Sequence, residues 1–454
     1  MGKDDVKELV VKELHPIWRK EQERVERIDK WHSGDNEDIV IPRGSSREHR
    51  ELREISKSPW LRLVVNSVVQ GLFVDSYRSP LHPPGKDGEV PTGPWYTWRA
   101  NRMPVRQIAL HRAAVAYSHA YTFLLPGVVG ERRTASIKTR SPKCMVAVYG
   151  DPGNDEWPLY ALDVDKQPGG KQMLQFVDEE AVHFLSCDTD GGKVEYIEYR
   201  EHDIGLCPVV RYAAQLDTEG AATGEVTPYI GNAKRIDKST YDRMLTQHWN
   251  SWKVRTATGM AKPDTEAEAN KAALLLRQGD LLASTDPNTR FGTLDETSLE
   301  PLIAAERSDI ETLAAVSQTP SHELTGQLVN LSAEALAAAR SGLRAKTFEY
   351  KVGFGESHVQ TLRLSALIEG NDADAADVMA RVTWQDTEVR SLAQAADALG
   401  KIATMLKVPV QALWGLIPGI EKTDVDEWAR LVQADPMAVL AEQLERQAVE
   451  QNRA

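Results

Sequence analysis

Residues 300–368 read EPLIAAERSDIETLAAVSQTPSHELTGQLVNLSAEALAAARSGLRAKTFEYKVGFGESHVQTLRLSALI. Apolar side chains recur at helical spacing in the first part of this stretch, and Pro320 disfavours helical backbone at Thr319, so the first helix should end there. Ser332 is a suitable N-cap for a second helix. The stretch therefore predicts two helices of unequal length, separated by a loop at Thr319–Asn330 that is too polar for a core turn.

The second predicted helix, Ala333–Ile368, runs for more than thirty residues. At 1.5 Å per residue, a helix of that kind is about 50 Å long. Such a length suits an assembly better than a lone globule. An ordinary helical hairpin within a single enzyme domain is the alternative interpretation.

Length and composition indicate a folded protein of several domains. The chain has 454 residues, 41% of them apolar, which allows roughly three domains of typical size. No apolar run approaches the ~18 residues of a membrane span. The segment 1–12 is charged and has no apolar region of a signal peptide, so we expect synthesis and function in the cytoplasm.

Charge and cysteine content exclude several classes of function. The net charge of 54 − 67 = −13 argues against a broad basic face that grips phosphates, but it is compatible with a channel through which nucleic acid slides. Cys144, Cys187 and Cys207 are odd in number and widely spaced. They fit neither a disulfide framework nor a paired-cysteine metal site, so reduced thiols are expected.

The amino-terminal half alternates helix and strand signals, which is typical of an α+β protein. Helices are predicted at Asp4–Asp29, where Pro16 interrupts a surface helix, and at Pro59–Gln70 and Tyr96–Tyr117. Between Tyr121 and Arg211 the pattern becomes mostly strand, with turn residues between short runs, and predicts a meander. The runs are Cys144–Tyr149, Trp157–Val164, Met173–Val177, Val182–Leu185 and Val194–Tyr199.

A further long helix should begin at Thr227, with Pro228 at its first position, and reach about Val254. Between it and the helix near Leu299 lies an insert, Thr256–Ser298. The insert should hold a small helix at Thr265–Arg277 and a strand at Asp280–Ala283. The carboxyl-terminal region is Ala-rich, with helices predicted at Thr387–Leu406, Val410–Leu416 and Asp424–Glu450.

The sequence holds few signs of catalysis. It lacks the phosphate-binding loop, the nucleophile elbow and the zinc-protease helix. Acid pairs such as Asp163 with Asp165, or Asp372 with Asp374, are possible magnesium ligands of a nuclease, since two-metal chemistry needs clustered carboxylates. Chance proximity explains them equally well, because Asp and Glu total 67.

Separated motifs over nearly the whole chain together resemble the portal proteins of tailed bacteriophages, in the type found in long-tailed phages of actinobacteria. None is specific alone, but chance does not explain their order and spacing. They are Asn66, Val69, Gly71 and Leu72; Trp98, Asn101 and Met103; Ala120 and Tyr121; Asp217–Arg255; Gln318, Thr319, Pro320, Glu323, Leu324 and Gly326; and Asn330–Leu336. One departure is Ser118, near which family members commonly have Gly.

The resemblance implies a ring of about twelve copies at one capsid vertex. Double-stranded DNA would pass through its channel during packaging and ejection. The ring would dock the terminase large subunit and later the head–tail adaptor protein, beside the major capsid protein and scaffold. It also implies a virion protein, assembled in the host cytoplasm, with no enzymatic activity, cofactor or membrane contact.

The family architecture implies a fold with an α/β wing, a two-helix stem, a small α/β clip, a tunnel loop and a helical crown. The implied boundaries are 1–225 and 332–385 for the wing, 226–255 and 299–318 for the stem helices, 256–298 for the clip, 319–331 for the tunnel loop and 386–454 for the crown.

The resemblance also points to residues that border the DNA. In the tunnel loop, weak hydrogen bonds to phosphates would permit sliding. The candidates are Ser321, His322, Glu323, Thr325, Gln327 and Asn330. On the first stem helix, Lys234, Lys238 and Arg243 are candidates for phosphate or intersubunit contacts. A solvated face, or salt bridges to a neighbouring subunit, is an equally open reading.

Two other classes of protein remain open. A metal-dependent nuclease or other hydrolase would use the neighbourhood of Asp163 or Asp188, and should bind magnesium or manganese. A different phage head or adaptor protein would also form symmetric assemblies, but should lack a clip inserted between two long helices.

Overall fold

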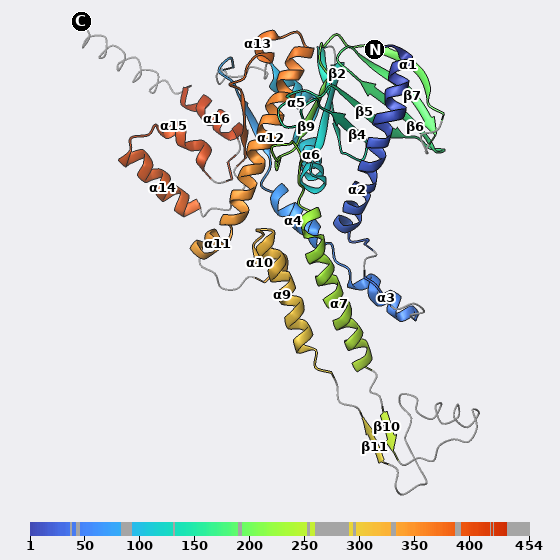
Figure 1. Ribbon diagram of the computed structural model, residues 1–454. Helices are drawn as coiled ribbons and strands as arrows, with labels where there is room; N and C mark the ends of the chain where they lie inside the picture. Colours follow the sequence, from blue (N-terminus) through green and yellow to red (C-terminus); the bar gives the residue numbers. More distant parts are fainter. Residues whose placement is uncertain are drawn as a thin grey trace. The chain divides into compact units, whose positions relative to one another are not determined.

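The protein is described here by a computed structural model that covers residues 1–36, 39–41, 46–82, 93–129, 132–188, 193–251, 255–258, 290–293, 297–327, 333–385, 392–417, 419–420 and 422–433. The chain divides into two compact units (Figure 1). One comprises Met1–Glu26, Val65–Glu225 and Leu343–Ala454, and is called the sheet unit below. The other comprises Arg27–Val64 and Val226–Gly342, and is called the helix-pair unit.

Helices and strands alternate in the first half of the chain, as expected. Its helices are α1 (Lys3–Leu9), a π-helical turn (Val10–Leu14), α2 (His15–Ser33), α3 (Arg47–Ser56), α4 (Trp60–Val69), α5 (Pro94–Ala100) and α6 (Met103–Tyr117). Its strands are β1 (Val74–Arg78), β2 (Ala120–Val129), β3 (Arg132–Arg140), β4 (Met145–Val148), β5 (Tyr160–Lys166), β6 (Lys171–Val177), β7 (Ala181–Asp188), β8 (Glu195–Glu201) and β9 (Val209–Tyr212).

The second half is mostly helical. Its elements are a 3-10 turn (Thr227–Tyr229), α7 (Ile230–Asn250), β10 (Arg255–Thr258), β11 (Arg290–Thr293), α9 (Glu300–Val316), α10 (Ser321–Thr325), α11 (Ala333–Ala339), α12 (Ser341–Ile368), α13 (Asp372–Ala375), β12 (Arg381–Trp384), α14 (Leu392–Met405), α15 (Val410–Leu413), a 3-10 turn (Trp414–Leu416) and α16 (Lys422–Gln433). No helix within the described ranges has the length and apolarity that a membrane crossing requires.

A five-stranded antiparallel sheet forms one half of the sheet unit's core. Its strand order, β4-β5-β6-β7-β8, is that of the predicted meander, which is confirmed. Gly169 and Gly170 connect β5 to β6 with φ of 93° and 80°, a backbone conformation that glycine adopts without steric cost.

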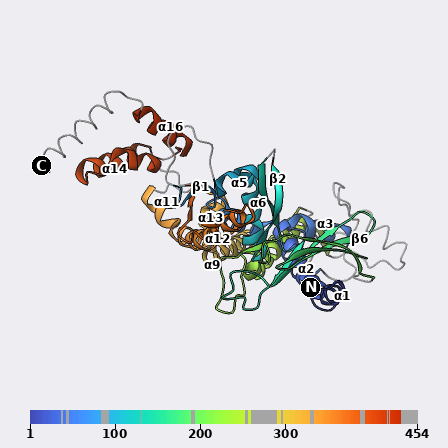
Figure 2. The ribbon, with the colours of Figure 1, turned by 90° about the horizontal axis from the view of Figure 1, so that it is seen from above.

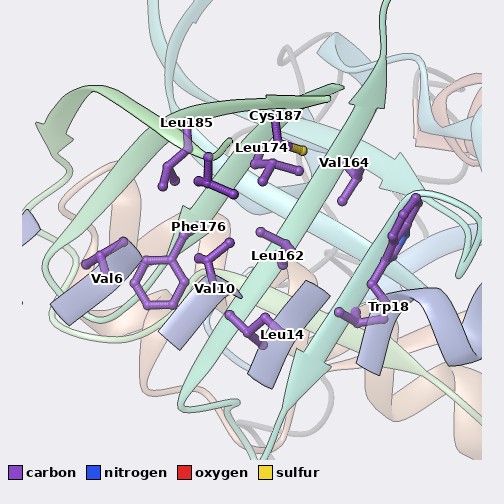
Figure 3. Close-up of a cluster of buried hydrophobic side chains, with 12 residues drawn as sticks. Val6, Val10, Leu14, Trp18, Leu162, Val164, Leu174, Phe176, Leu185 and Cys187 are labelled. Carbon is purple, nitrogen blue, oxygen red and sulfur yellow. The ribbon is translucent and has the colours of Figure 1, made fainter. Parts of the chain in front are cut away.

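The amino-terminal helix covers one face of this sheet. Val6, Val10, Leu14 and Trp18 recur every four residues, so they share one side of the helix, and they pack on apolar side chains of the sheet (Figure 3). The helix does not break near Pro16; the interruption takes the form of the π-helical turn directly before it. What the sequence predicted as a surface helix therefore closes a core.

A second sheet, in the order β3-β2-β9, packs against the first. Helix α6 contacts β2 and β3, and α5 contacts α6, so these elements lie side by side (Figure 2). Strands β1 and β12 form a separate antiparallel pair although more than 300 residues separate them. The helix predicted at Tyr96–Tyr117 is in fact two helices, divided at Asn101 and Arg102.

Helix α12 carries a buried polar network into the sheet unit. His358 contacts His111 of α6 through the two Nε2 atoms at 2.8 Å, and its Nδ1 contacts the Tyr212 hydroxyl at 2.9 Å. Burial lowers the pKa of both histidines. Because neutral imidazoles donate at one nitrogen and accept at the other, the network can be satisfied without charge.

The end of α6 explains the departure at Ser118. This residue has φ of 84° and is buried, in a region of backbone space that glycine occupies more easily than serine. Its hydroxyl lies 3.3 Å from Arg24 Nη2 and 3.0 Å from His119 Nδ1. The unusual conformation is thus accompanied by side-chain contacts that glycine could not make.

Two predictions about the second half need correction. The long helix expected at Ala333–Ile368 is interrupted at Arg340, which separates α11 from α12. Ser341 and Gly342 follow the break, and glycine in particular has a low helix propensity. The insert begins and ends with β10 and β11, an antiparallel pair that the sequence did not predict. Its predicted helix at Thr265–Arg277 and strand at Asp280–Ala283 lie outside the described residues.

Candidate functional site

Helices α7 and α9 of the helix-pair unit pack against each other in antiparallel fashion. Near the middle of α7, Asp309 accepts a hydrogen bond from Ser239 Oγ at 2.9 Å. Further along, Glu306 accepts from Thr240 Oγ1 at 3.1 Å and from Arg243 Nε at 2.5 Å. The contact between the two helices is therefore a row of polar and ionic bonds.

The far end of the pair is also held by polar groups. The side chain of Asn250 donates to the Thr297 carbonyl at 2.7 Å and accepts from the Thr297 amide at 3.3 Å. This residue thus fixes the end of α7 to the segment that leads into α9. Asn250 thereby joins the two helices at the end of the pair that lies next to the insert.

The buried apolar residues of the pair lie between its middle and the opposite end. Its buried apolar residues are Ile230, Ala233, Ile236 and Tyr241 of α7 and Leu313 and Ala314 of α9. Trp249, near the insert, is 57% exposed. In the half of the pair nearer the insert, apolar side chains such as Leu245 and Leu302 are only partly buried, so polar contacts have the larger share in holding it.

Asp237 is a buried carboxylate on α7 that the sequence analysis did not single out. It accepts hydrogen bonds from Asn36 Nδ2 at 3.2 Å and from the Ser58 amide at 3.3 Å. Burial raises the pKa of Asp237 to about 6, while these bonds and Lys57 oppose the rise. The residue ties the segment between α2 and α4 to the helix pair.

The cations predicted on this helix have carboxylate neighbours in their own chain. Lys238 pairs with Asp242 one turn along α7, and Arg243 pairs with Glu306 of α9. Lys234 is exposed. A DNA-facing or intersubunit role for these three residues stays a prediction.

The segment after α9 is more ordered than the predicted open loop. Thr319 is buried, and Ser321–Thr325 form the short helix α10 with Leu324 buried on its inner side. Gly326 ends the helix with φ of 67°, which is the usual role of glycine after a helix. Because the segment is polar in composition, its sequence pattern did not indicate that Leu324 is buried.

The predicted loop residues differ in their surroundings. Ser321 and Gln327 are exposed, whereas His322, Glu323 and Thr325 are partly buried. Glu323 pairs with Arg340 at 2.9 Å, which links α10 to the residue between α11 and α12. Asn330 and the predicted N-cap Ser332 lie outside the described residues.

One of the acid pairs that suggested a nuclease, Asp163 with Asp165, has a basic partner. Asp163 is fully buried on β5, with Arg140 Nε 3.0 Å from its Oδ2, and the same guanidinium reaches Asp165 at 3.4 Å. Burial raises the pKa of Asp163 to about 6 against the attraction of Arg140. Within the described ranges, no cluster of three His, Cys, Asp or Glu side chains is arranged to hold a metal ion.

Glu306 and Asp309 hold the helix pair together, and sequence reasoning missed both. They are three residues apart and so lie on one face of α9. Arg235 and Arg243, eight residues apart on α7, are their basic partners. The acidic and basic residues at these spacings are visible in the sequence. Their pairing could have been predicted only if the antiparallel packing of the two helices had been known.

The sequence of residues 12–451 matches the profile of a family described as phage portal protein, SPP1 Gp6-like. No curated protein matches the chain. Among solved structures, the chain is similar to one from the virion of a native gene transfer agent particle, at 11% identity and a TM-score of 0.41, over 86% of this chain and 98% of that one. A chain from the neck of the native particle, computed with C12 symmetry, gives 10% identity and a TM-score of 0.40, over 86% and 99%.

The family match spans nearly the whole chain and carries the assignment without the structural likenesses. It agrees with the portal resemblance read from the separated motifs. The chain therefore belongs to the SPP1 Gp6-like family of phage portal proteins, structural proteins of the virion that form a ring at a capsid vertex and a channel for DNA.

Proposed function

We propose that α7 and α9 are the stem helices of the ring and that one face of the pair borders the DNA channel. The observation that carries this is the neutralisation of charge within the pair. Arg243 is matched by Glu306 and Lys238 by Asp242, which leaves little excess cation to hold phosphates. DNA can then slide, because few counterions are released on contact.

The ring would hold about twelve subunits, a number that rests on the resemblance to portal proteins. From the same resemblance, we infer that the protein comes from a long-tailed phage of actinobacteria. We also infer that the ring is assembled in the host cytoplasm. We infer that the ring hydrolyses nothing itself and that a separate terminase supplies the force. The acidic net charge of −13 supports a conduit over a DNA-gripping enzyme.

The proposed regions keep the boundaries predicted from the sequence, from the wing at 1–225 to the crown at 386–454. The helix-pair unit also includes Arg27–Val64, a segment within the proposed wing. The hydrogen bonds of Asn36 and Ser58 to Asp237 account for this association. We therefore infer that the segment supports the stem.

The proposed partners follow from the same regions. The clip, whose ends are joined by β10 and β11, would meet the terminase large subunit during packaging and the head–tail adaptor protein afterwards. The wing would contact the major capsid protein and scaffold. Pull-down of purified terminase by the ring, and its loss when 259–289 is replaced by a short linker, tests the clip assignment.

The segment at 319–331 would narrow the channel as a tunnel loop. Ser321 and Gln327 are exposed, and we assign the contact with DNA to them, whereas Glu323 is engaged by Arg340. Deletion of residues 323–327 should spare ring assembly and impair DNA packaging or retention. Glu323→Gln, which removes only the ion pair, is the matched control and should package normally.

Wild-type packaging by the deletion variant would contradict the tunnel-loop assignment. The ring itself is tested by native mass spectrometry and negative-stain images of the purified protein. A closed particle of about a dozen subunits with a central hole is expected, because heterologous contacts that close form rings. A monomer or an open filament at every concentration would contradict the proposal.

A further inference from the structure

Helices α3, α7 and α9 form one layer with α7 in the middle. Helix α7 contacts α9 on one flank and α3 on the other. On the α3 flank, the rings of His49 and Trp249 meet edge to face with centroids 6.3 Å apart, and Ser58 binds Asp237. Both flanks of α7 are thus occupied within the chain, so α3 and α9 form the two edges of the layer, and α10 contacts α9 as well.

Each edge helix carries an exposed isoleucine and a charged side chain. Ile55 of α3 is 64% exposed, and Ile303 of α9 is 53% exposed. Within the part of the chain that the structure describes, neither Arg50 of α3 nor Glu300 of α9 has a hydrogen-bond or ion-pair partner for its side chain. A hollow of about 500 Å³ on the α3 face is lined by Arg47, Arg50, Glu51, Arg53, Glu54 and Ile55.

The two free charges lie at the same level of the layer. Trp249, near the end of α7, meets His49 on one flank, and the next residue, Asn250, binds Thr297 on the other. Arg50 directly follows His49, and Glu300 lies three residues after Thr297. A rotation about an axis along the layer keeps each residue at its level, so it can bring Arg50 of one copy to Glu300 of the next.

A ring needs two different faces that complement each other, because each subunit contacts its neighbours through a heterologous interface. We propose that the outer face of α3 in one subunit packs against the outer face of α9 in the next, with Arg50 paired to Glu300 and Ile55 beside Ile303. The inference rests on the proposed stem function of α7 and α9. It adds α3 as the helix that joins neighbouring stems.

A charge exchange tests this contact. Arg50→Glu and Glu300→Arg should each lower the fraction of chain in rings, whereas the double variant should restore it. An interface ion pair that is reversed places like charges together, so we expect a loss of about tenfold in ring-forming affinity for each single variant. Native mass spectrometry over a dilution series measures the ring fraction.

Lys171→Glu carries the same change of charge on an exposed residue of β6 and should assemble like the wild type. Circular dichroism of each variant shows whether it is folded. Glu300→Arg places a cation at a helix N-terminus, which is unfavourable for the helix itself. Arg50→Gln and Glu300→Gln are therefore a second pair of variants that remove each charge without reversing it. Each of these should weaken assembly without the repulsion, and therefore by less than the reversed charge.

The outcomes separate this inference from the proposed function. If the wild type forms no ring, the stem proposal itself fails. If the wild type forms rings and both charge reversals assemble normally, the α3–α9 contact is overturned. If both single variants lose rings and the double variant does not recover, Arg50 and Glu300 do not pair and the stated contact is wrong.

Discussion

Two helix contacts in this protein differ in the chemistry of their side chains: one is apolar and the other is polar and ionic. The amino-terminal helix meets the five-stranded sheet through fully or nearly fully buried Val6, Val10, Leu14 and Trp18. Helix α7 meets α9 through hydrogen bonds and ion pairs among partly exposed side chains, centred on Glu306. The first contact removes apolar area from water, and the second mainly exchanges protein–water bonds for bonds within the protein.

The difference has an energetic meaning. Apolar burial contributes roughly 25 cal/mol per Å², whereas a partly exposed ion pair contributes about 1 kcal/mol or less. The core of the sheet unit is therefore stabilised by apolar contacts within a single chain. The helix pair is lightly stabilised by itself, which suits the proposed stem, whose outer faces would be covered by neighbouring copies in the ring.

The largest effect is expected in the apolar contact. Phe176→Ala removes a fully buried ring from the cluster beneath the amino-terminal helix, and such a cavity costs about 3–5 kcal/mol. Hydrogen exchange of β5, β6 and β7 should accelerate accordingly. Tyr199→Ala, at an exposed position of β8, is the control and should change little. Equal protection in Phe176→Ala would show that this core is not what holds the sheet unit.

A smaller effect of the opposite sign is expected at Asp237. Its folded pKa of about 6 lies above the ordinary value, so its contribution to the free energy of unfolding is greatest below about pH 4 and declines as the pH rises to about 6. Asp237→Asn removes the buried charge and keeps an acceptor for Ser58. The variant should be more stable than the wild type by about 1–2 kcal/mol at pH 8.

At pH 4 this advantage should disappear, because the wild-type carboxyl is then largely protonated. Thermal unfolding at the two pH values measures the difference. Asp242→Asn changes an exposed carboxylate of the same helix and serves as the matched control. A stabilisation by Asp237→Asn that is equal at pH 4 and pH 8 would mean that the buried charge is not its cause.

The smallest effect is expected across the helix pair. A double-mutant cycle of Arg243→Ala and Glu306→Ala should give a coupling energy of about 1 kcal/mol that shrinks with added salt. The same cycle at Lys238 and Asp242, within one helix, should give about 0.3 kcal/mol. A coupling at Arg243 and Glu306 comparable to the loss in Phe176→Ala would remove the contrast between the two contacts.

Local patterns predicted the elements that bury a regular face. The meander β4–β8 and helices α4, α7 and α9 follow from periodicity and turn residues, and their positions in the structure agree closely with the expected ranges. The pair β10 and β11 was missed. Its strands have four residues each and lie far apart in the chain, so neither has a pattern that exceeds the background.

The candidate site was predicted less completely than the fold. The polar segment after α9 was found from Pro320 and its composition, but its helix α10 depends on the burial of Leu324. The breaks at Asn101–Arg102 and Arg340 were also missed, because the apolar spacing continues across both. Periodicity reports which face is apolar and is insensitive to a change in helix direction.

The amino-acid sequence by itself determined that this chain is an α+β portal protein with two long helices on either side of an insert, because periodicity, turn residues and separated motifs are local properties. Only the tertiary structure decided that Glu306 binds Arg243, that Asp237 is buried and holds Asn36 and Ser58, and that Asp163 is paired with Arg140. Each of these depends on which distant segments meet. Charge and polarity in a sequence do not specify their partners, since many pairings of 54 basic and 67 acidic residues are compatible with the same pattern.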